Sequence, residues 1–409
     1  MPVAAQKLRL AERMARLGTE GAFEVLVRAR QLEAEGRDII HLEIGEPDFP
    51  TADHIIDAAA RALRNGWTHY GPPAGLPELR EAVAEDAGRR RGISIHPGEV
   101  VITPGAKPIM FFVILALVEE GEEVLYPNPG FPIYESMVQF VGARPVPYAL
   151  GEERDFDVDA EAVLGKITDR TKLLILNSPH NPTGGVMRAG TLAALAEGLE
   201  APGRREIFIL SDEIYNRLIF DGEHASLAQF PALKERTIIL DGFSKAYAMT
   251  GWRLGYGVMR PDLAEQVALL VTNSNSCTSS FSQMAAVDAL RGDQDCVERM
   301  REEFRRRRGV IVEGLNAIPG FRCRQPHGAF YAFPNISGAG RDSRSLANAL
   351  LADAGVACLS GTAFGAWGEG YLRFSFANSV DNIRKALERI DRWVRKYSIP
   401  IPAFRSTSR

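Results

Sequence analysis

Residues 237–259, TIILDGFSKAYAMTGWRLGYGVM, place a polar, glycine-rich stretch between two short apolar runs, TIIL and LGYGVM. Short apolar runs bounded by turn residues are typical of strands that are buried on both faces of a sheet. Lys245 closely follows the first run, and Arg253 lies eight residues further on. An amine held between an apolar strand and the compact sequence AYAMTGW is expected to be partly desolvated, which lowers its pKa. Such an amine is nucleophilic and can form a Schiff base.

The same rhythm of short apolar runs and helical patterns begins near residue 100. The further runs are VVI (100–102), VLY (124–126), RPVPY (144–148), KLLIL (172–176) and IFIL (207–210). All seven runs together predict an α/β fold, with a large domain whose mostly parallel seven-stranded sheet has helices on both faces. Polar motifs follow most of these runs, and ligands of such sheets bind beyond the carboxyl ends of the strands. We therefore expect a single active site at that edge.

The pattern changes towards the C-terminus. A helix over residues 295–318, with apolar residues at 297, 300, 304, 311 and 315, is expected to lead out of the sheet. The segment RRRR (305–308) on this helix is expected to form a solvated face rather than a nucleic-acid patch. Beyond residue 320, the short runs HGAFYAF, GVACLSG and YLRFSFA alternate with helices near 343–354 and from 381. These elements predict a second, smaller α+β domain.

Length and composition indicate the number of domains and argue against nucleic-acid-binding and membrane proteins. A chain of 409 residues exceeds what one hydrophobic core usually organises, so two domains are expected. The net charge of -4 provides no basic field for nucleic acid, and the longest apolar run, IMFFVILALV (109–118), is too short to cross a membrane. The four cysteines are scattered and the N-terminal segment lacks a signal-peptide core. We therefore expect reduced thiols and a cytoplasmic location.

The common nucleotide and metalloprotease motifs are absent from the sequence. It contains no GxGxxG after a predicted strand, no GxxxxGK[ST], no HExxH and no zinc-type cysteine spacing, so we expect no metal. What it contains is a set of unlike polar groups after the predicted strands: TPGAKP (103–108), NPGF (128–131), NSPHNPTG (177–184) and SDEIY (211–215).

The stretch GFSKAYAMTGWRLG (242–255) resembles the attachment motif [GS]-x-[ST]-K-x(5)-G-x-R-x-G of the class I/II pyridoxal-phosphate-dependent aminotransferases, which are fold type I enzymes. The resemblance covers roughly residues 20–395, and each motif falls in the family's order. It implies that Lys245 forms a Schiff base with the aldehyde of pyridoxal 5'-phosphate and that Arg253 binds the phosphate.

The resemblance also assigns the groups around the cofactor ring, whose nitrogen must stay protonated opposite a buried carboxylate. Residues 212–215, DEIY, resemble the family's D-E-x-Y, in which Asp212 would pair with the ring nitrogen and Tyr215 would reach the phenolic oxygen. Asn181 matches the second donor to that oxygen, whereas Asn177 is expected to form a turn. Phe131 would stack on the ring.

The phosphate would be held by backbone donors. Gly105, Ala106 and Lys107 would offer their N–H groups at a helix N-terminus, because Pro108 stands where a helix would start. Ser244 is a further candidate for this group.

Two features of the phosphate site depend on the family pattern. Position 242 is glycine where many relatives carry a serine that contacts the phosphate, and the sequence does not decide whether Ser244 replaces it. Tyr70, in WTHYGPP, matches a tyrosine that crosses a dimer interface to the partner's phosphate. The resemblance therefore implies a homodimer with shared active sites.

The substrate would be bound from both ends of the chain. Arg373, in YLRFSFA, fits the family's arginine for the α-carboxylate, which a planar guanidinium binds at two points. Gly45, in LEIGEPDFP, resembles the glycine loop that closes over the substrate, and Asn181 is also expected to contact the substrate. Accordingly, residues 1–50 and 320–409 are expected to form the small lid domain, and residues 51–319 the large cofactor-binding domain.

The implied reaction moves an amino group from an L-amino acid to a 2-oxo acid by a ping-pong mechanism. Lys245 would act as the general base that shuttles a proton between the substrate Cα and the cofactor. Lys107 matches a lysine that related bacterial aspartate aminotransferases place near the distal carboxylate of the substrate, which favours acidic substrates. Two alternatives stay open: another pyridoxal-phosphate reaction, catalysed by a β-lyase, cyclase or oxidase, and a non-enzymatic cofactor-sensing regulator.

Overall fold

The computed structural model describes residues 8–397. Its largest feature is a seven-stranded sheet with the order β2-β8-β7-β6-β5-β3-β4. Only β8 runs antiparallel to its neighbours, and the other pairs are parallel, so the predicted mostly parallel α/β sheet is confirmed. Each predicted apolar run is one of its strands: β2 (Val100–Thr103), β3 (Glu123–Asn128), β4 (Arg144–Ala149), β5 (Thr171–Asn177), β6 (Phe208–Asp212), β7 (Thr237–Gly242) and β8 (Gly255–Val258).

Helices cover both faces of this sheet because successive side chains of each strand point to opposite faces. Leu173 of β5 packs towards one face and Leu174 towards the other, in two separate hydrophobic clusters. The first face is covered by α4 (Lys107–Leu117), α5 (Ile133–Phe140) and α9 (Pro261–Ser274). The second is covered by α3 (Pro77–Arg91), α6 (Ala160–Leu164), α7 (Ala189–Leu199), α8 (Pro231–Lys234) and α10 (Ser280–Arg291).

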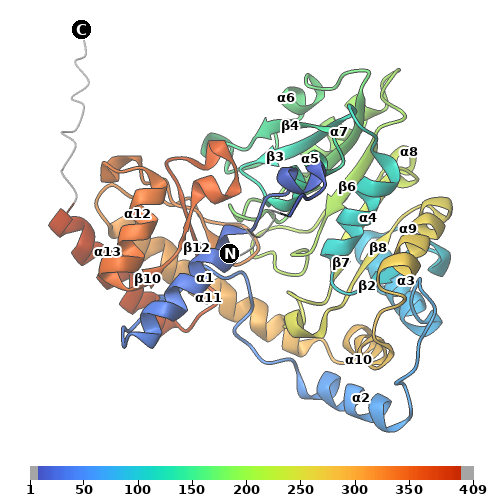
Figure 1. Ribbon diagram of the computed structural model, residues 1–409, viewed down its shortest axis with the longest axis horizontal. Coiled ribbons are helices and arrows are strands. Elements are labelled where there is room, and N and C mark those ends of the chain that lie inside the picture. The colour runs from blue at the N-terminus through green and yellow to red at the C-terminus, as the bar shows by residue number, and fades with distance from the viewer. Residues whose placement is uncertain (1–7, 398–409) are drawn as a thin grey trace, which may run out of the picture.

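An N-terminal helix and the C-terminal elements lie together beside the sheet, whereas the earlier short helix η1 (Glu12–Arg16) packs against α5 on the large sheet. In Figure 1 the blue helix α1 (Gly21–Ala34) lies among the orange and red C-terminal elements, whereas α2 (Asp53–Arg64) lies at the far side next to α10. Strand β1 (Ile40–His41) pairs in parallel with β10 (Val356–Ala357). A second small sheet contains β9 (Tyr331–Ala332), β11 (Leu359–Ser360) and β12 (Leu372–Ser375), and is flanked by α12 (Ser343–Ala349) and α13 (Val380–Tyr397).

This arrangement brings residues from both ends into one hydrophobic cluster. The exact domain boundaries at 50/51 and 319/320 stay a prediction, and residues 1–7 and 398–409 of the predicted small domain lie outside the described part. Across residues 8–397, no helix has the length and apolarity that a bilayer crossing needs.

The long helix α11 (Asp295–Ala317) connects the sheet to this end cluster. Its predicted apolar positions, from Val297 to Leu315, are all buried. The predicted solvated face at residues 305–308 is partly wrong, because Arg307 and Arg308 are buried. Their planar guanidinium groups stack on aromatic rings, as is typical of arginine.

Each buried arginine has carboxylate partners as well as a ring. Arg307 donates to Asp48 at 2.6 Å and to Glu303 at 2.8 Å, and lies 4.9 Å from the Phe49 ring centre. Arg308 pairs with Asp221. These contacts tie α11 to segments that are distant in the sequence, which explains why local charge patterning did not predict them.

We expect Arg307→Ala to lower the free energy of unfolding by about 2 kcal/mol, because it removes a buried guanidinium that packs on the Phe49 and Phe304 rings. Arg306→Ala is the matched control: Arg306 is exposed, pairs only with Glu303 and should change stability by less than about 0.5 kcal/mol. Urea unfolding measures both values. Equal effects of the two substitutions would contradict the assigned role of Arg307.

Candidate active site

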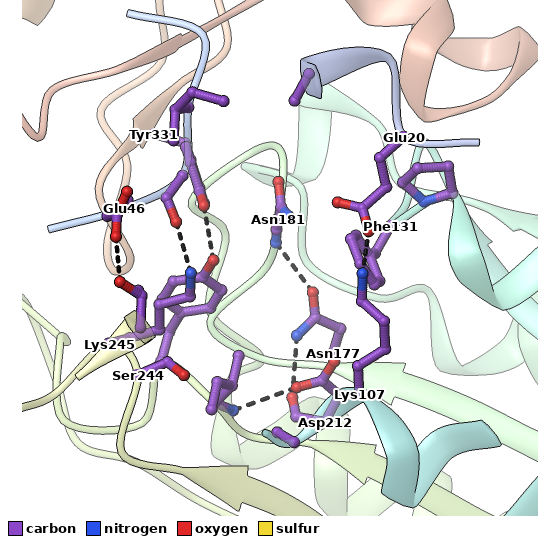
Figure 2. Close-up of a pocket in the computed structure, with 18 of the residues that line it drawn as sticks. Glu20, Glu46, Lys107, Phe131, Asn177, Asn181, Asp212, Ser244, Lys245 and Tyr331 are labelled. Atoms are coloured by element: carbon purple, nitrogen blue, oxygen red, sulfur yellow. Dashed lines mark hydrogen bonds and ion pairs between the residues drawn. The ribbon is translucent and has the colours of Figure 1, made fainter. Parts of the chain in front are cut away.

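A cavity of ≈ 580 Å³ opens at the carboxyl ends of the large sheet, between the sheet and the small-sheet end of the chain. Figure 2 shows polar side chains from several strand ends pointing into it. Most of the residues that the sequence predicted for the site line this cavity: Gly45, Ala106, Lys107, Phe131, Asn181, Asp212, Tyr215, Ser244, Lys245, Arg253 and Arg373.

Two predicted residues do not line the cavity. Gly105 lies directly beneath Arg253, where a Cβ would come within 2.2 Å of the guanidinium, and its φ of +93° is one that glycine adopts readily. Tyr70 lies outside the cavity lining, and 88% of its surface is exposed. The single chain therefore brings Gly105 to the edge of the site and leaves Tyr70 away from it.

Lys245 follows β7 and is enclosed by the loop at Gly45. Its Nζ donates a hydrogen bond to the carbonyl oxygen of Gly45 at 2.5 Å. Burial lowers the pKa of Lys245 to about 8. A Cβ at position 45 would lie 2.1 Å from the hydroxyl oxygen of Tyr331, so a larger residue there would displace that hydroxyl. The amine is thus desolvated, as the flanking apolar sequence predicts.

Asp212 is the last residue of β6, and only 7% of its surface is exposed. One carboxylate oxygen accepts a hydrogen bond from the Tyr134 hydroxyl, and the other accepts from the backbone N–H of Ile214 at 3.3 Å. Burial raises the pKa of Asp212 to about 6, although the hydrogen bond from Tyr134 acts in the opposite direction. A carboxylate in this position favours any cation that enters the cavity.

Two asparagines and two tyrosines line the cavity between Lys245 and Asp212. Asn177 donates its amide to the carbonyl oxygen of Asp212 at 3.0 Å and accepts from the backbone N–H of Asn181, so it shapes the turn as predicted. The hydroxyls of Tyr215 and Tyr331 lie 2.7 Å apart in a hydrogen bond.

Arg373 lies on β12 and is 3% exposed. Its Nη1 donates to the side-chain oxygen of Asn181 at 3.0 Å, and its Nη2 donates to the backbone oxygen of Glu43. The guanidinium also lies 4.4 Å from the centre of the Tyr331 ring. Its Nε is buried without a hydrogen-bond partner, so the group keeps donor capacity for a ligand.

Arg253 lies beside the turn that precedes α4. Its Nη1 donates to the carbonyl oxygen of Thr250 at 2.8 Å. The close approach of the turn depends on Gly255, where a Cβ would lie 2.2 Å from the backbone nitrogen of Ala106. A Cβ at Gly242 would lie 2.9 Å from the Cα of Gly255, so a serine at 242 would require a shift of this backbone.

Four of the charged groups that line the cavity have no ion-pair partner in the described chain, unlike Lys107 and Glu20, which pair with each other. Within residues 8–397, neither Asp212 nor Lys245 nor Arg373 belongs to any ion pair, and Arg253 has only carbonyl oxygens as hydrogen-bond acceptors. An amine, a carboxylate and two guanidinium groups match an aldehyde, a protonated ring nitrogen, a phosphate and a substrate carboxylate. This donor set therefore fits pyridoxal phosphate and an amino acid.

Three residues that line or support the cavity were not predicted. Tyr134 comes three residues after Phe131, at the start of α5, and that helical spacing was the available signal. Tyr331 lies in the run HGAFYAF, which indicated only a strand. Glu20 pairs with Lys107 at one wall of the cavity, and no local motif marks it.

Comparison with known proteins shows which family this chain belongs to. The family model for aminotransferase class I and II matches residues 37–390. The aspartate aminotransferase of Geobacillus stearothermophilus is 40% identical over 95% of this chain and 99% of its own length. The aspartate/prephenate aminotransferase of Thermus thermophilus is 39% identical over 94% and 98%. The solved Thermus thermophilus aspartate aminotransferase with maleate superimposes with a TM-score of 0.89, at 39% identity, covering 94% of this chain and 99% of that chain.

Fold and site together define a pyridoxal-phosphate-dependent enzyme with the fold type I architecture. The chain belongs to the class I and II aminotransferases. It moves an amino group from an L-amino acid to a 2-oxo acid.

The raised pKa of Asp212 predicts that the free energy of unfolding of the cofactor-free protein depends on pH. Between about pH 4 and pH 6 the unfolded chain releases the Asp212 proton while the folded chain retains it, so stability falls as pH rises. The shift from 3.8 to about 6 corresponds to about 3 kcal/mol above pH 6. We therefore expect Asp212→Asn to stabilise the cofactor-free protein at pH 7 by up to that amount, and to have little effect at pH 4.

Thermal unfolding across this pH range measures the effect. Asp57→Asn, at an exposed aspartate of α2, is the control and should leave the profile unchanged. If Asp212→Asn does not stabilise the protein at pH 7, Asp212 does not carry the assigned burial cost.

Proposed function

We propose that this aminotransferase favours substrates with acidic side chains, aspartate or glutamate, and that the residues of the cavity divide cofactor and substrate binding as follows. Arg373 is the observation that carries the proposal, because it is a buried guanidinium that faces the cavity without a carboxylate partner. It would bind the α-carboxylate of the amino acid at two points. Asn181 and Gly45 would complete the α-carboxylate side of the site.

The ring of the cofactor would be held from three directions. When bound, pyridoxal phosphate supplies a carbonyl carbon for the amino group and an electron-withdrawing ring. Asp212 would face the ring nitrogen and keep it protonated. Tyr215 and Asn181 would donate to the phenolic oxygen, and Phe131 would stack on the ring face.

The phosphate would lie at the N-terminus of α4. The backbone N–H groups of Gly105, Ala106 and Lys107 would bind it there, because the helix dipole favours an anion at a helix N-terminus. Arg253 would add a cation, and Ser244, which lines the cavity, would add a hydroxyl.

Lys245 would hold the cofactor through its Nζ and then act as the general base. A pKa of about 8 leaves a useful fraction of this amine neutral near neutral pH. The freed amine would take the proton from the substrate Cα and deliver it to the cofactor within the same half-reaction, and the second half-reaction would reverse this transfer. Gly45, which contacts the amine, and Tyr331, which lies against Gly45, would exclude water from it.

The acidic preference rests on a second cation. Lys107 lines the cavity at the first residue of α4, and its Nζ would meet the distal carboxylate of the substrate. Two named relatives are aspartate aminotransferases, and one solved relative carries maleate, which is also a dicarboxylate.

We further propose a homodimer. The partner subunit's Tyr70 would reach the phosphate, since Tyr70 is exposed and lies away from the cavity of its own chain. A cytoplasmic location stays a prediction, and the four unpaired cysteines agree with it.

The test is a half-reaction screen with the cofactor-loaded enzyme and one amino acid at a time. We expect the visible absorption of the cofactor to change fastest with aspartate and glutamate, and without any acceptor, because the two halves of the reaction are separate. Lys245→Ala should abolish this change. If the absorption changes only when amino acid and 2-oxo acid are present together, the ping-pong mechanism is wrong. A faster response to neutral amino acids would contradict the acidic preference.

A further inference from the structure

Lys107 is not free to receive a substrate in this structure. Its Nζ forms an ion pair with the carboxylate of Glu20, and it lies 5.3 Å from the centre of the Phe131 ring. Figure 2 shows Glu20, Lys107 and Phe131 together at one wall of the cavity, across from Lys245 and Tyr331. The cation that the proposed function assigns to the distal carboxylate already has a carboxylate partner from the chain itself.

Glu20 reaches this position from the other part of the molecule. It precedes α1, which packs among the C-terminal elements, whereas Lys107 begins α4 on the large sheet. An acidic residue at a helix N-cap commonly accepts hydrogen bonds from its own helix, but Glu20 makes no such bond. Residues 20–23 all line the cavity. The side chain of Glu20 is therefore directed to the substrate space.

The charge of Glu20 is also felt by the other cations of the cavity. It acts to raise the pKa of both Lys245 and Arg373, against the larger lowering by burial. The Phe131 ring lies beside the pair, and Phe23 and Met110 are further apolar side chains that line the same cavity. With Glu20 in place, this wall has no net charge and can contact an apolar group. Without Glu20, it presents an uncompensated ammonium.

We propose that Glu20 is a specificity-determining residue that acts as an internal counter-ion for Lys107. An acidic substrate replaces Glu20 on Lys107, whereas a neutral or aromatic substrate leaves the ion pair intact and packs against it. One cavity thus accepts two chemical classes of side chain, and Glu20 sets the ratio between them. This inference rests on the proposed function, because it assumes that Arg373 holds the α-carboxylate and Lys107 faces the substrate side chain.

The energetics favour such an exchange. The side chains of Lys107 and Glu20 are 47% and 19% exposed, and a partly exposed ion pair of this kind is weak. Replacement of one carboxylate by another at the same ammonium is therefore nearly balanced. The neutral substrate gains because an ammonium buried against an apolar group without a counter-ion is unfavourable.

The experiment compares Glu20→Gln with the wild-type enzyme on aspartate and phenylalanine. The substitution keeps the shape of the side chain and removes its charge, so kcat/KM for aspartate should rise about three- to fivefold and that for phenylalanine should fall by a similar factor. Lys107→Gln should shift the ratio in the opposite direction. Glu24→Gln, at an exposed glutamate one turn further along α1, is the matched control and should leave the ratio unchanged.

Binding gives a second measurement that needs no turnover. Calorimetry of the cofactor-loaded enzyme should show tighter binding of succinate and weaker binding of 3-phenylpropionate in Glu20→Gln. If both the kinetic ratio and the binding ratio match those of Glu24→Gln, Glu20 is only a surface ion-pair partner and the inference is wrong. That result leaves the aminotransferase function intact, whereas the loss of acidic preference in the wild-type screen contradicts the proposed function itself.

Discussion

The site depends on one constraint: the charged groups of Asp212, Lys245 and Arg373 must be held in a buried cavity without ion-pair partners from the described chain. Asp212 and Lys245 lie at the ends of neighbouring strands, and burial shifts the pKa of each towards its neutral form. Arg373 adds a third charge from the small sheet. Desolvated charges of this kind are costly in the free protein, and a ligand that carries the complementary groups removes the cost. The cavity is therefore complementary to a specific set of charges before any ligand enters.

The adjacent residues Asp212 and Glu213 show how the fold leaves one buried carboxylate unpaired and pairs the other. Glu213 is equally buried, but it is paired with Arg91 and His224 and accepts a hydrogen bond from Ser226. Although burial acts to raise it, these partners hold the pKa of Glu213 well below its usual value. The strand alternation directs Glu213 into this satisfied network and Asp212 into the cavity. Only the residue that faces the ligand is left without a counter-ion.

Local sequence predicted what strand ends and turns determine. The seven apolar runs predicted the seven strands of the sheet. Asp212 and Lys245 come just after two of these runs, and parallel strands align their carboxyl ends, so both residues were expected at one edge. Contacts between distant segments could not be predicted in the same way. Tyr331 and Glu20 enter the site only because the two chain ends fold over the sheet, and Arg307 is buried by partners far away in the sequence. None of these three has a periodic or motif signal of its own.

A crystal structure of the pyridoxal-phosphate-loaded protein tests the central claim most directly. The account predicts continuous electron density between the Nζ of Lys245 and the cofactor, with the ring nitrogen at a charge-assisted hydrogen-bond distance of about 2.8 Å from the Asp212 carboxylate. It also predicts the phosphate beside Arg253. A ring bound elsewhere, with Asp212 still bonded only to Tyr134 and Ile214, would contradict it.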